Sequence, residues 1–190
     1  VELGDSVTFD PEYITFGDGY LCSKAIDDRA GCAIMLELIK EDLQYDTWFV
    51  FTVQEEVGTR GATIAAERIH PQEAIIIETT TCADFTGVEE TDHVTKAKGG
   101  AVISVMDRGT VYDKEMVQRA ISLAKEHGIN YQMKQSIAGG NDAGAVHKSG
   151  AGVRTLAISV PCRYLHSTSC VAAVEDIQAV HDICAKLICE

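Results

Sequence analysis

The sequence is poor in several residue types that mark particular classes of protein. Of its 190 residues, three are proline and one is tryptophan, and aromatic residues make up 6%. Hydrophobic residues reach 46% and charged residues 24%, a composition typical of neither a disordered nor a fibrous chain. We therefore expect one globular domain, or one domain with an appendage.

Clusters of basic residues and long apolar runs are also missing. The chain carries 16 Lys and Arg against 29 Asp and Glu, a net charge of −13. Such a chain repels phosphate backbones and anionic lipids, so we expect no nucleic-acid partner and no membrane partner. Apolar runs such as 74–77 are too short to span a bilayer, and no signal-peptide pattern opens the chain. We predict a soluble cytoplasmic protein.

The seven cysteines include no C-x-x-C pair. An odd number of cysteines without this spacing fits reduced, mostly buried thiols better than a disulfide framework or a cysteine zinc site. We expect each cysteine to be structural rather than catalytic.

Helical and strand patterns alternate from Asp27 onward, after short β-like pieces that resemble the tail of a small β unit. Continuous apolar strands between helices predict an α/β protein, a three-layer α/β/α sandwich with helices on both faces of the sheet. The expected strands are 48–53, 74–77, 101–105 and 153–160. One helix is expected to start at Asp27, two more to cover 61–68 and 114–127, and the last to run from about 171 to the C-terminus.

Carboxylates and one histidine lie at strand ends or at a helix start. Since ligands bind at the carboxyl ends of the strands in such sheets, we expect these side chains at one edge. Carboxylates with an imidazole suit zinc, cobalt or manganese. In two-metal hydrolases the ions share a carboxylate, and a further carboxylate takes the proton of the water. The candidates are Asp27, Glu55, Glu56, Glu78 and His166.

Spacing alone is also compatible with simpler roles for these acids. Glu55 and Glu56 can form a solvated turn after a strand, and Asp27 and Asp28 can cap a helix. Glu78 can be a strand-end charge. A pair of acids could also act as the acid and nucleophile of a glycoside hydrolase, although the shortage of aromatic residues argues against a sugar-stacking cleft.

Three ordered blocks resemble the signature of a known family. They read S-K-A-I-D-D-R-A-G-C at 23–32, T-V-Q-E-E-V-G-T-R-G-A at 52–62 and P-C-R-Y-L-H-S at 161–167. In this order they resemble the M42 family of metallo-aminopeptidases, which includes members once described as endoglucanases. The similarity runs from about Asp5 to the C-terminus.

The resemblance implies a role for each candidate residue. Asp27 matches the carboxylate that bridges two divalent ions, zinc or cobalt, and Glu55 matches the general base. Glu56 and Glu78 each match a ligand of one ion, and His166 matches the imidazole ligand. The implied activity is the hydrolysis of N-terminal residues from peptide substrates, by an enzyme that forms a homo-oligomer.

The resemblance also bears on neighbouring residues. Asp28 is expected either behind the metal ligands or as a helix cap, and Glu78 stands where many relatives have aspartate, so it is a longer ligand. The glycine-rich turn 139–144 resembles one near the family's active site. It can equally be a helix entry capped by Asn141 or Asp142.

The family pattern contains an upstream His-x-Asp whose histidine binds the second ion, and the sequence holds no such tripeptide. We therefore expect 1–20 to be the remnant of an inserted β domain used for subunit contacts, and 21–190 to be the catalytic domain without its N-terminal segment. One metal position would then be incomplete, and an inactive assembly or binding module is the non-enzymatic alternative. Among the other histidines, His147 is the rival of His166 as a ligand.

Overall fold

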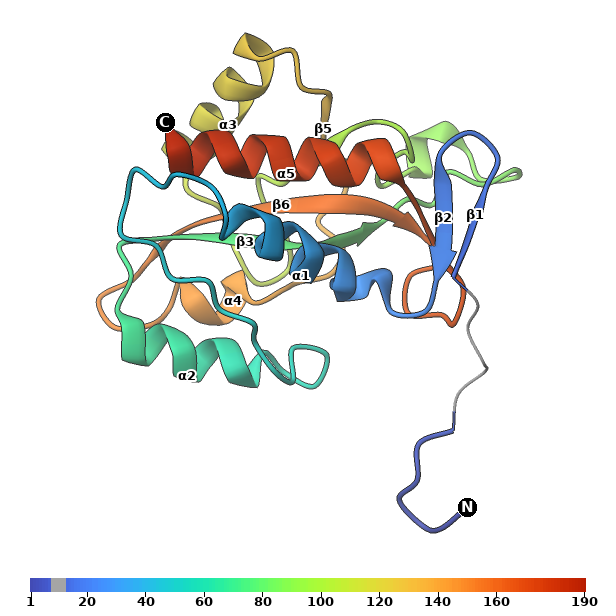
Figure 1. The fold of residues 1–190 in the computed structure, drawn as a ribbon, viewed down its shortest axis with the longest axis horizontal. Coiled ribbons are helices and arrows are strands. Elements are labelled where there is room, and N and C mark those ends of the chain that lie inside the picture. The colour runs from blue at the N-terminus through green and yellow to red at the C-terminus, as the bar shows by residue number, and fades with distance from the viewer. Residues whose placement is uncertain (8–12) are drawn as a thin grey trace.

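Helices and strands alternate along most of the chain in the computed structural model, which describes residues 1–7 and 13–190 (Figure 1). The predicted α/β class is confirmed. The strands are β1 (Ile14–Phe16), β2 (Tyr20–Ser23), β3 (Glu73–Thr81), β4 (Ala101–Ile103), β5 (Tyr131–Met133), β6 (Arg154–Arg163) and β7 (Cys170–Ala173). The helices are α1 (Ile26–Leu38), α2 (Arg60–Ile69), α3 (Lys114–Glu126), α4 (Ala143–Val146) and α5 (Val174–Cys189), with a 3-10 turn η1 at Glu90–Asp92.

The strands form one mixed sheet in the order β1-β2-β7-β6-β4-β5, and β3 pairs with the other edge of β6. β3 and β6 run parallel, with Glu73 opposite Arg154 at one end and Thr81 opposite Cys162 at the other. β4 and β7 share the second edge of β6 and are both antiparallel to it. β6 is therefore the centre of the sheet. The four-residue strand β7 stands where the sequence predicted the start of the last helix.

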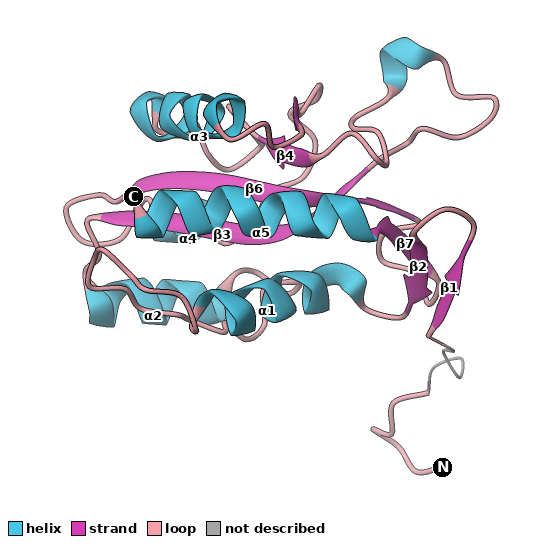
Figure 2. Cartoon of the chain, turned by 45° about the horizontal axis from the view of Figure 1, so that its top comes forward, coloured by secondary structure: helices cyan, strands magenta, loops and turns pink. Residues whose placement is uncertain are grey.

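Helices cover both faces of this sheet, as predicted for a three-layer sandwich. On one side, α5 packs between α1 and α3 and lies against β6 and β4. On the other side, α4 contacts β3 and β6, and α2 packs on α4. α5 and α4 lie on opposite sides of β3 and β6 in Figure 1, and in Figure 2 α5 is drawn in front of these strands and α4 behind them. Between the layers lie fully buried apolar side chains that include Leu38, Leu156, Ile158, Val180 and Ile183.

Both central strands are longer than predicted. Glu78 lies inside β3, opposite Ser159 of β6, instead of just past the end of the strand. β6 continues through Pro161, because proline is tolerated where its missing N–H would face no ladder partner. The carbonyl of Ala157 accepts a bond from Ser104 on the β4 side, and alternation along the strand turns Pro161 to that side. There it falls between the residues that pair with β4 and those that pair with β7.

The predicted strand 48–53 is not a strand in the structure. Trp48 is 73% exposed and Val53 is 68% exposed. Among the described residues, the Val53 carbonyl accepts a backbone bond from Gly61, and no strand pairs with the segment. The prediction was wrong because an apolar pattern reports side-chain preference, whereas a strand also needs a neighbouring backbone to complete its ladder.

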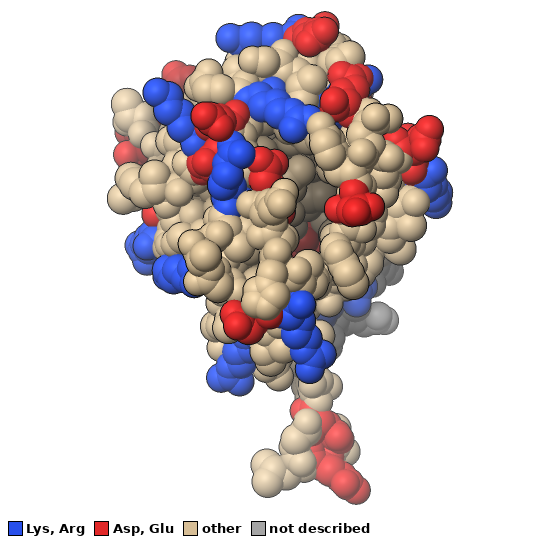
Figure 3. Space-filling view, turned by 90° about the vertical axis from the view of Figure 1, so that its left-hand side faces the viewer, with Lys and Arg blue, Asp and Glu red and all other residues tan. Residues whose placement is uncertain are grey.

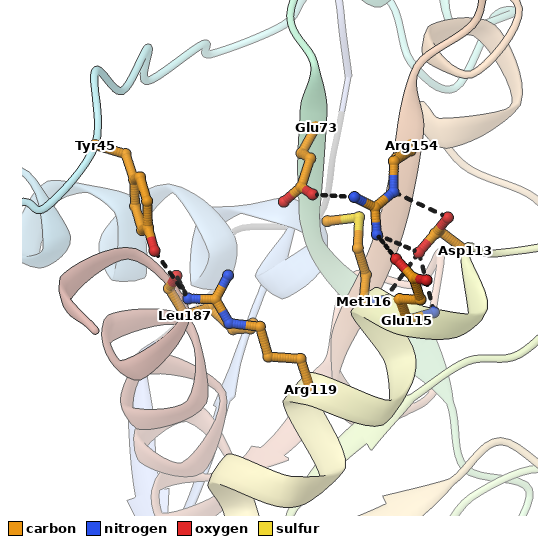
Figure 4. Close-up of polar contacts among 8 residues, drawn as sticks. All are labelled: Tyr45, Glu73, Asp113, Glu115, Met116, Arg119, Arg154 and Leu187. Carbon is orange, nitrogen blue, oxygen red and sulfur yellow. Dashed lines mark hydrogen bonds and ion pairs between the residues drawn. The ribbon is translucent and has the colours of Figure 1, made fainter.

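Arg154, at the start of β6, ties β3 and α3 together (Figure 4). Its guanidinium lies 2.7 Å from Glu73, and 2.9 Å from both Asp113 and Glu115. Asp113 also caps α3, since its Oδ1 accepts the backbone N–H groups of Glu115 and Met116. The Arg154 bond and these N–H groups hold the pKa of Asp113 at about 2. The helix predicted at 114–127 is confirmed to within one residue.

The N-terminal hairpin extends the same sheet. β1 pairs with β2, and β2 pairs antiparallel with β7. The ammonium of Lys98 and the guanidinium of Arg163 both lie over the Tyr20 ring, 5.2 and 5.6 Å from its centre. Residues 8–12 lie outside the described part of the chain. The assignment of 1–20 as the remnant of an inserted domain stays a prediction.

The face shown in Figure 3 carries charges of both signs. Lys and Arg side chains are interspersed with Asp and Glu over this face, so the net negative charge does not form one acidic field there. None of the helices in the described ranges combines the length and the apolar character needed to cross a membrane.

Candidate metal centre

Three of the predicted site residues meet at a surface hollow. One ligand atom each of Asp27, Glu56 and His166 lies within 4.8 Å of the other two. Nε2 of His166 is 3.3 Å from Oδ2 of Asp27 and 3.3 Å from Oε1 of Glu56. Ligand atoms around a tetrahedral ion with bonds of about 2.1 Å lie roughly 3.4 Å apart. The three side chains therefore fit one divalent cation.

The chain reaches this hollow from three separate elements. Asp27 stands in the first turn of α1, Glu56 lies in the turn before α2, and His166 lies in the loop between β6 and β7. Tyr164 and His166 both have left-handed backbone, with φ of 57° and 58°. This conformation costs non-glycine residues on the order of 1 kcal/mol or more and is concentrated at functional sites. The loop that presents His166 is thus held in a conformation that local preference alone would not select.

Glu55 precedes Glu56 in the turn before α2, and its pKa is raised to about 7. Burial is the largest cause, and the negative charges of Asp142 and Glu56 add to it. The charge of His166 acts in the opposite direction. A carboxyl group with a pKa near the working pH can take a proton and return it, which is the role of a general base and acid.

Asp28 serves as a cap inside the first turn of α1. Its Oδ1 accepts the backbone N–H of Gly31 at 2.9 Å. Burial raises its pKa to about 8, although the Gly31 bond opposes the shift, and the charges of Asp27 and Glu55 raise it further. A Cβ on Gly31 would lie 2.2 Å from Oδ2 of Asp28. The glycine of the D-D-R-A-G block therefore leaves room for the Asp28 carboxyl.

Glu78 lies outside the group of three. Its Oε1 accepts a bond from Nδ2 of Asn141 at 2.9 Å and a longer one from Oγ of Ser159 at 3.4 Å. Burial raises its pKa well above the ordinary value, and the charges of Asp28 and Asp27 act in the same direction. The pKa of the Glu78 carboxyl thus depends in part on the acids of the hollow. The role of Glu78 as a metal ligand stays a prediction.

Comparison with known proteins identifies the family. The family model described as M42 glutamyl aminopeptidase matches residues 1–183. The chain belongs to the M42 peptidase family. This confirms the resemblance drawn from the three sequence blocks.

Relatives of this M42 chain match nearly all of it. A protein of Acetivibrio thermocellus, named provisionally as an aminopeptidase, is 38% identical over 193 residues, covering 100% of this chain and 57% of the relative. The structure of aminopeptidase APDkam598 from the archaeon Desulfurococcus kamchatkensis has a TM-score of 0.92 and 32% identity, over 95% of this chain and 52% of that one.

A structure of the Pyrococcus horikoshii TET1 peptidase, titled as able to assemble into a tetrahedron or a large octahedral shell, has a TM-score of 0.81 and 30% identity. The match covers 96% of this chain and 54% of that one. The chain spans about half the length of the curated relatives it matches.

The M42 blocks bring residues to the hollow that sequence reasoning did not single out. Lys24 and Ser167 line it and belong to the first and third blocks, so membership of these blocks could have indicated that they lie near the site. Thr168 and Cys170 also line it, without any such signal. The Sγ of Cys170 lies 3.3 Å from the carbonyl oxygen of Ser167, consistent with the structural role expected of the cysteines.

The glycine-rich turn of the M42 pattern caps a helix entry, as one of its two expected roles required, and it also reaches Glu78. Oδ1 of Asn141 accepts the N–H of Ala143 at 2.8 Å and so caps the entry to α4, while its amide nitrogen reaches Glu78. Oδ2 of Asp142 accepts the hydroxyl of Thr52 at 2.6 Å. Its Oδ1 is buried without a partner among the described residues.

The rival histidine lies elsewhere. Nδ1 of His147 is 2.7 Å from the carbonyl oxygen of Ala143, inside its own turn. Among the described residues, His147 is not part of the group that could hold an ion. The structure thus brings His166, and not His147, to the acids.

Acidic groups dominate the charge of the hollow and its surroundings. Burial and their mutual repulsion raise the pKa of several of them. A bound cation would oppose these shifts, because it favours the charged carboxylates and accepts their lone pairs. The residues present therefore fit a divalent metal. The acids are Asp27, Asp28, Glu55, Glu56, Glu78 and Asp142.

Proposed function

We propose that the chain carries the catalytic site of a metal-dependent aminopeptidase that removes N-terminal residues from peptides. The observation that carries the proposal is the meeting of Asp27, Glu56 and His166 within 4.8 Å, with Glu55 adjacent in sequence to one of them. Membership of the M42 family supports the same activity. Asp27, Glu56, Glu78 and His166 would hold two zinc or cobalt ions in this proposal, and Asp27 would serve as a ligand of both.

In this proposal the protein's own residues position and move the proton. Divalent ions held by the four ligands would polarise the scissile carbonyl and lower the pKa of a water. Glu55 accepts the proton of that water and delivers it to the leaving amine, and its pKa of about 7 suits both transfers. Lys24 and Ser167 line the hollow beside the ligands and are placed to contact the peptide.

The proposal includes an incomplete second metal position. The M42 pattern has a His-x-Asp tripeptide whose histidine binds an ion, and residues 1–190 contain none. A site that lacks one ligand binds its ion weakly. We therefore propose that full activity requires a further ligand from outside these residues.

A homo-oligomer and a cytoplasmic location are also proposals. The Pyrococcus horikoshii relative is titled as assembling into closed shells, which supports self-association in this family. The exposed apolar side chains on 48–53 are surface that an assembly could cover.

Hydrolysis of aminoacyl p-nitroanilides tests the activity. We expect turnover that a chelator abolishes and that added zinc or cobalt restores, at a low level because the second metal position lacks one ligand. Glu55→Gln should lower turnover about 100-fold or more while bound metal is unchanged, since general-base catalysis contributes roughly 10²–10⁴. Glu126→Gln, on the exposed face of α3, is the matched control. Wild-type turnover in Glu55→Gln would exclude Glu55 as the base.

The same assay separates the alternative activities. A glycoside hydrolase with a carboxylate pair would cleave a β-glucan substrate in the presence of chelator. An assembly or binding module would show no turnover of any substrate with or without metal. Either result would replace the aminopeptidase proposal.

A further inference from the structure

A chain of buried hydrogen bonds runs from the loop after β4 to Glu78. Nδ2 of Asn141 lies 2.9 Å from Oε1 of Glu78 and 2.8 Å from the hydroxyl oxygen of Tyr112. The Tyr112 hydroxyl donates in turn to Oδ2 of Asp107. Asp107, Tyr112 and Asn141 are 5%, 4% and 6% exposed. The mechanism proposed above uses none of these three side chains.

The far end of this chain is a fixed acceptor. The backbone N–H groups of Gly109 and Thr110 donate to Oδ1 of Asp107 at 2.7 and 2.8 Å. These bonds fix the carboxylate, so that its Oδ2 faces Tyr112. A tyrosine hydroxyl has one proton, and Tyr112 uses it in the hydrogen bond to Asp107. The Tyr112 oxygen is therefore left as an acceptor for the next residue.

The near end of the chain is a fixed donor. Oδ1 of Asn141 accepts the N–H of Ala143 at 2.8 Å, which settles the orientation of the amide. The two N–H bonds of the amide then point to Oε1 of Glu78 and to the Tyr112 hydroxyl, and Oδ2 of Asp107 lies at a longer 3.3 Å from the same nitrogen. Each link determines the next, so the chain ends in an N–H aimed at one oxygen of Glu78.

We propose that Asp107, Tyr112 and Asn141 form a positioning relay that holds the carboxylate of Glu78 for a divalent cation. The proposal rests on the assignment of Glu78 as a metal ligand in the proposed function. Asn141 occupies Oε1, so Oε2 is the oxygen left for the ion. A glutamate has one more rotatable bond than an aspartate, and restraining it in advance lowers the entropy lost on binding. Hydrogen bonds behind metal ligands typically change metal affinity 10–100-fold.

Zinc affinity of the whole chain, measured by competition with a chromophoric chelator, tests the relay. Tyr112→Phe removes the hydroxyl and keeps the ring, and Asn141→Asp keeps the shape but replaces the N–H donor by an acceptor. We expect each to weaken zinc binding about 10–100-fold. Tyr131→Phe, in half-buried β5 outside the relay, is the matched control and should bind zinc as the wild-type chain does.

A double-mutant cycle separates positioning from general stabilisation. Glu78→Gln should itself weaken zinc binding, and Tyr112→Phe in that background should have no further effect, because the relay acts through Glu78. Urea unfolding of each metal-free variant reports its folding stability independently. An affinity loss that persists in the Glu78→Gln background and follows the lost stability would show a structural role and overturn the relay.

The remaining outcomes distinguish the relay from the function on which it rests. If Tyr112→Phe bound zinc like the wild-type chain while Glu78→Gln bound it weakly, the relay would be overturned and the ligand assignment kept. If Glu78→Gln bound zinc as tightly as the wild-type chain, or the wild-type chain bound no zinc, the ligand assignment would fail and the relay with it.

Discussion

His166 presents its Nε2 atom 3.3 Å from Oδ2 of Asp27, although one residue precedes the last strand and the other opens the first helix. The sheet joins them, because β2 leads into α1 and pairs with β7, which follows the His166 loop. The same nitrogen lies 3.3 Å from Oε1 of Glu56. His166 is thus the shared neighbour of both acids, and it offers the group its one nitrogen atom as a candidate ligand.

Removing this nitrogen should abolish tight metal binding. We expect His166→Ala to weaken zinc affinity more than 100-fold, since even residues behind the ligands cost about 10–100-fold. His147→Ala is the matched control, because its ring bonds within its own turn. Equal zinc affinities of the two variants, measured by chelator competition, would remove His166 from the ligand set.

The metal-free protein should lose stability as the pH rises from about 5 to about 8. The pKa of Asp28 is raised to about 8 and that of Glu55 to about 7, so the folded state holds more protons than the unfolded state in this range. Stability falls with pH wherever the folded state binds the extra protons, and each pKa unit corresponds to about 1.4 kcal/mol. We expect a decrease of roughly 4 kcal/mol or more by urea unfolding in chelator, with Asp28 contributing most of it.

Two controls belong to this pH experiment. Asp28→Asn keeps the acceptor for the Gly31 N–H and should flatten the pH dependence. Saturating zinc should weaken or reverse the dependence, because the ion binds deprotonated carboxylates. A metal-free protein that is more stable at about pH 8 than at about pH 5 would contradict the raised pKa values of these buried acids.

Gly31 should tolerate no side chain. In Gly31→Ala the new methyl group would meet Oδ2 of Asp28 at 2.2 Å, so the Asp28 carboxyl must move and its capping bond is lost. We expect a loss of about 1–3 kcal/mol in the free energy of unfolding. At Gly144, in α4, the nearest atom to an added Cβ is at 3.8 Å, and Gly144→Ala should be neutral or slightly stabilising. Calorimetry of both variants checks the contrast.

Asp113 should matter more than Glu115, although both pair with Arg154. Asp113 also accepts two backbone N–H groups at the start of α3, whereas Glu115 is largely exposed. We expect Asp113→Ala to cost about 1–2 kcal/mol, because a helix cap is lost, and Glu115→Ala to cost about 0.5 kcal/mol or less. Similar midpoints in urea for both variants would mean that the cap contributes little.

The sequence predicted the layers of the fold better than the individual pairings. The apolar runs of β3 and β6 are surrounded by other elements, so their pattern and their structure agree. The run at 48–53 has the same pattern but no strand partner in the described chain, and Trp48 stays exposed. β7 was missed because its four residues run directly into a helix, and their strand conformation depends on pairing with β2 and β6.

The meeting of the candidate ligands was predictable to the extent that these residues lie in recognisable blocks. Asp27, Glu56 and His166 come together as expected, and Glu55 lies beside them with a perturbed pKa. The bonds of Asp107 and Tyr112 to Asn141 had no signal, since these residues lie far apart in the sequence and in no shared motif. Such contacts arise only from the packing of the β4 loop against the turn before α4.

The central position of β6 implies that the core and the candidate site differ in how easily they open. β6 is paired with β3 on one side and with β4 and β7 on the other, so its amide protons exchange with solvent only when most of the domain opens. Asp27, Glu56 and His166 stand on a helix start, a turn and a loop, where opening requires less free energy. These three side chains can therefore separate and come together again while the core stays folded. An ion that binds them when they are together shifts this local equilibrium by mass action.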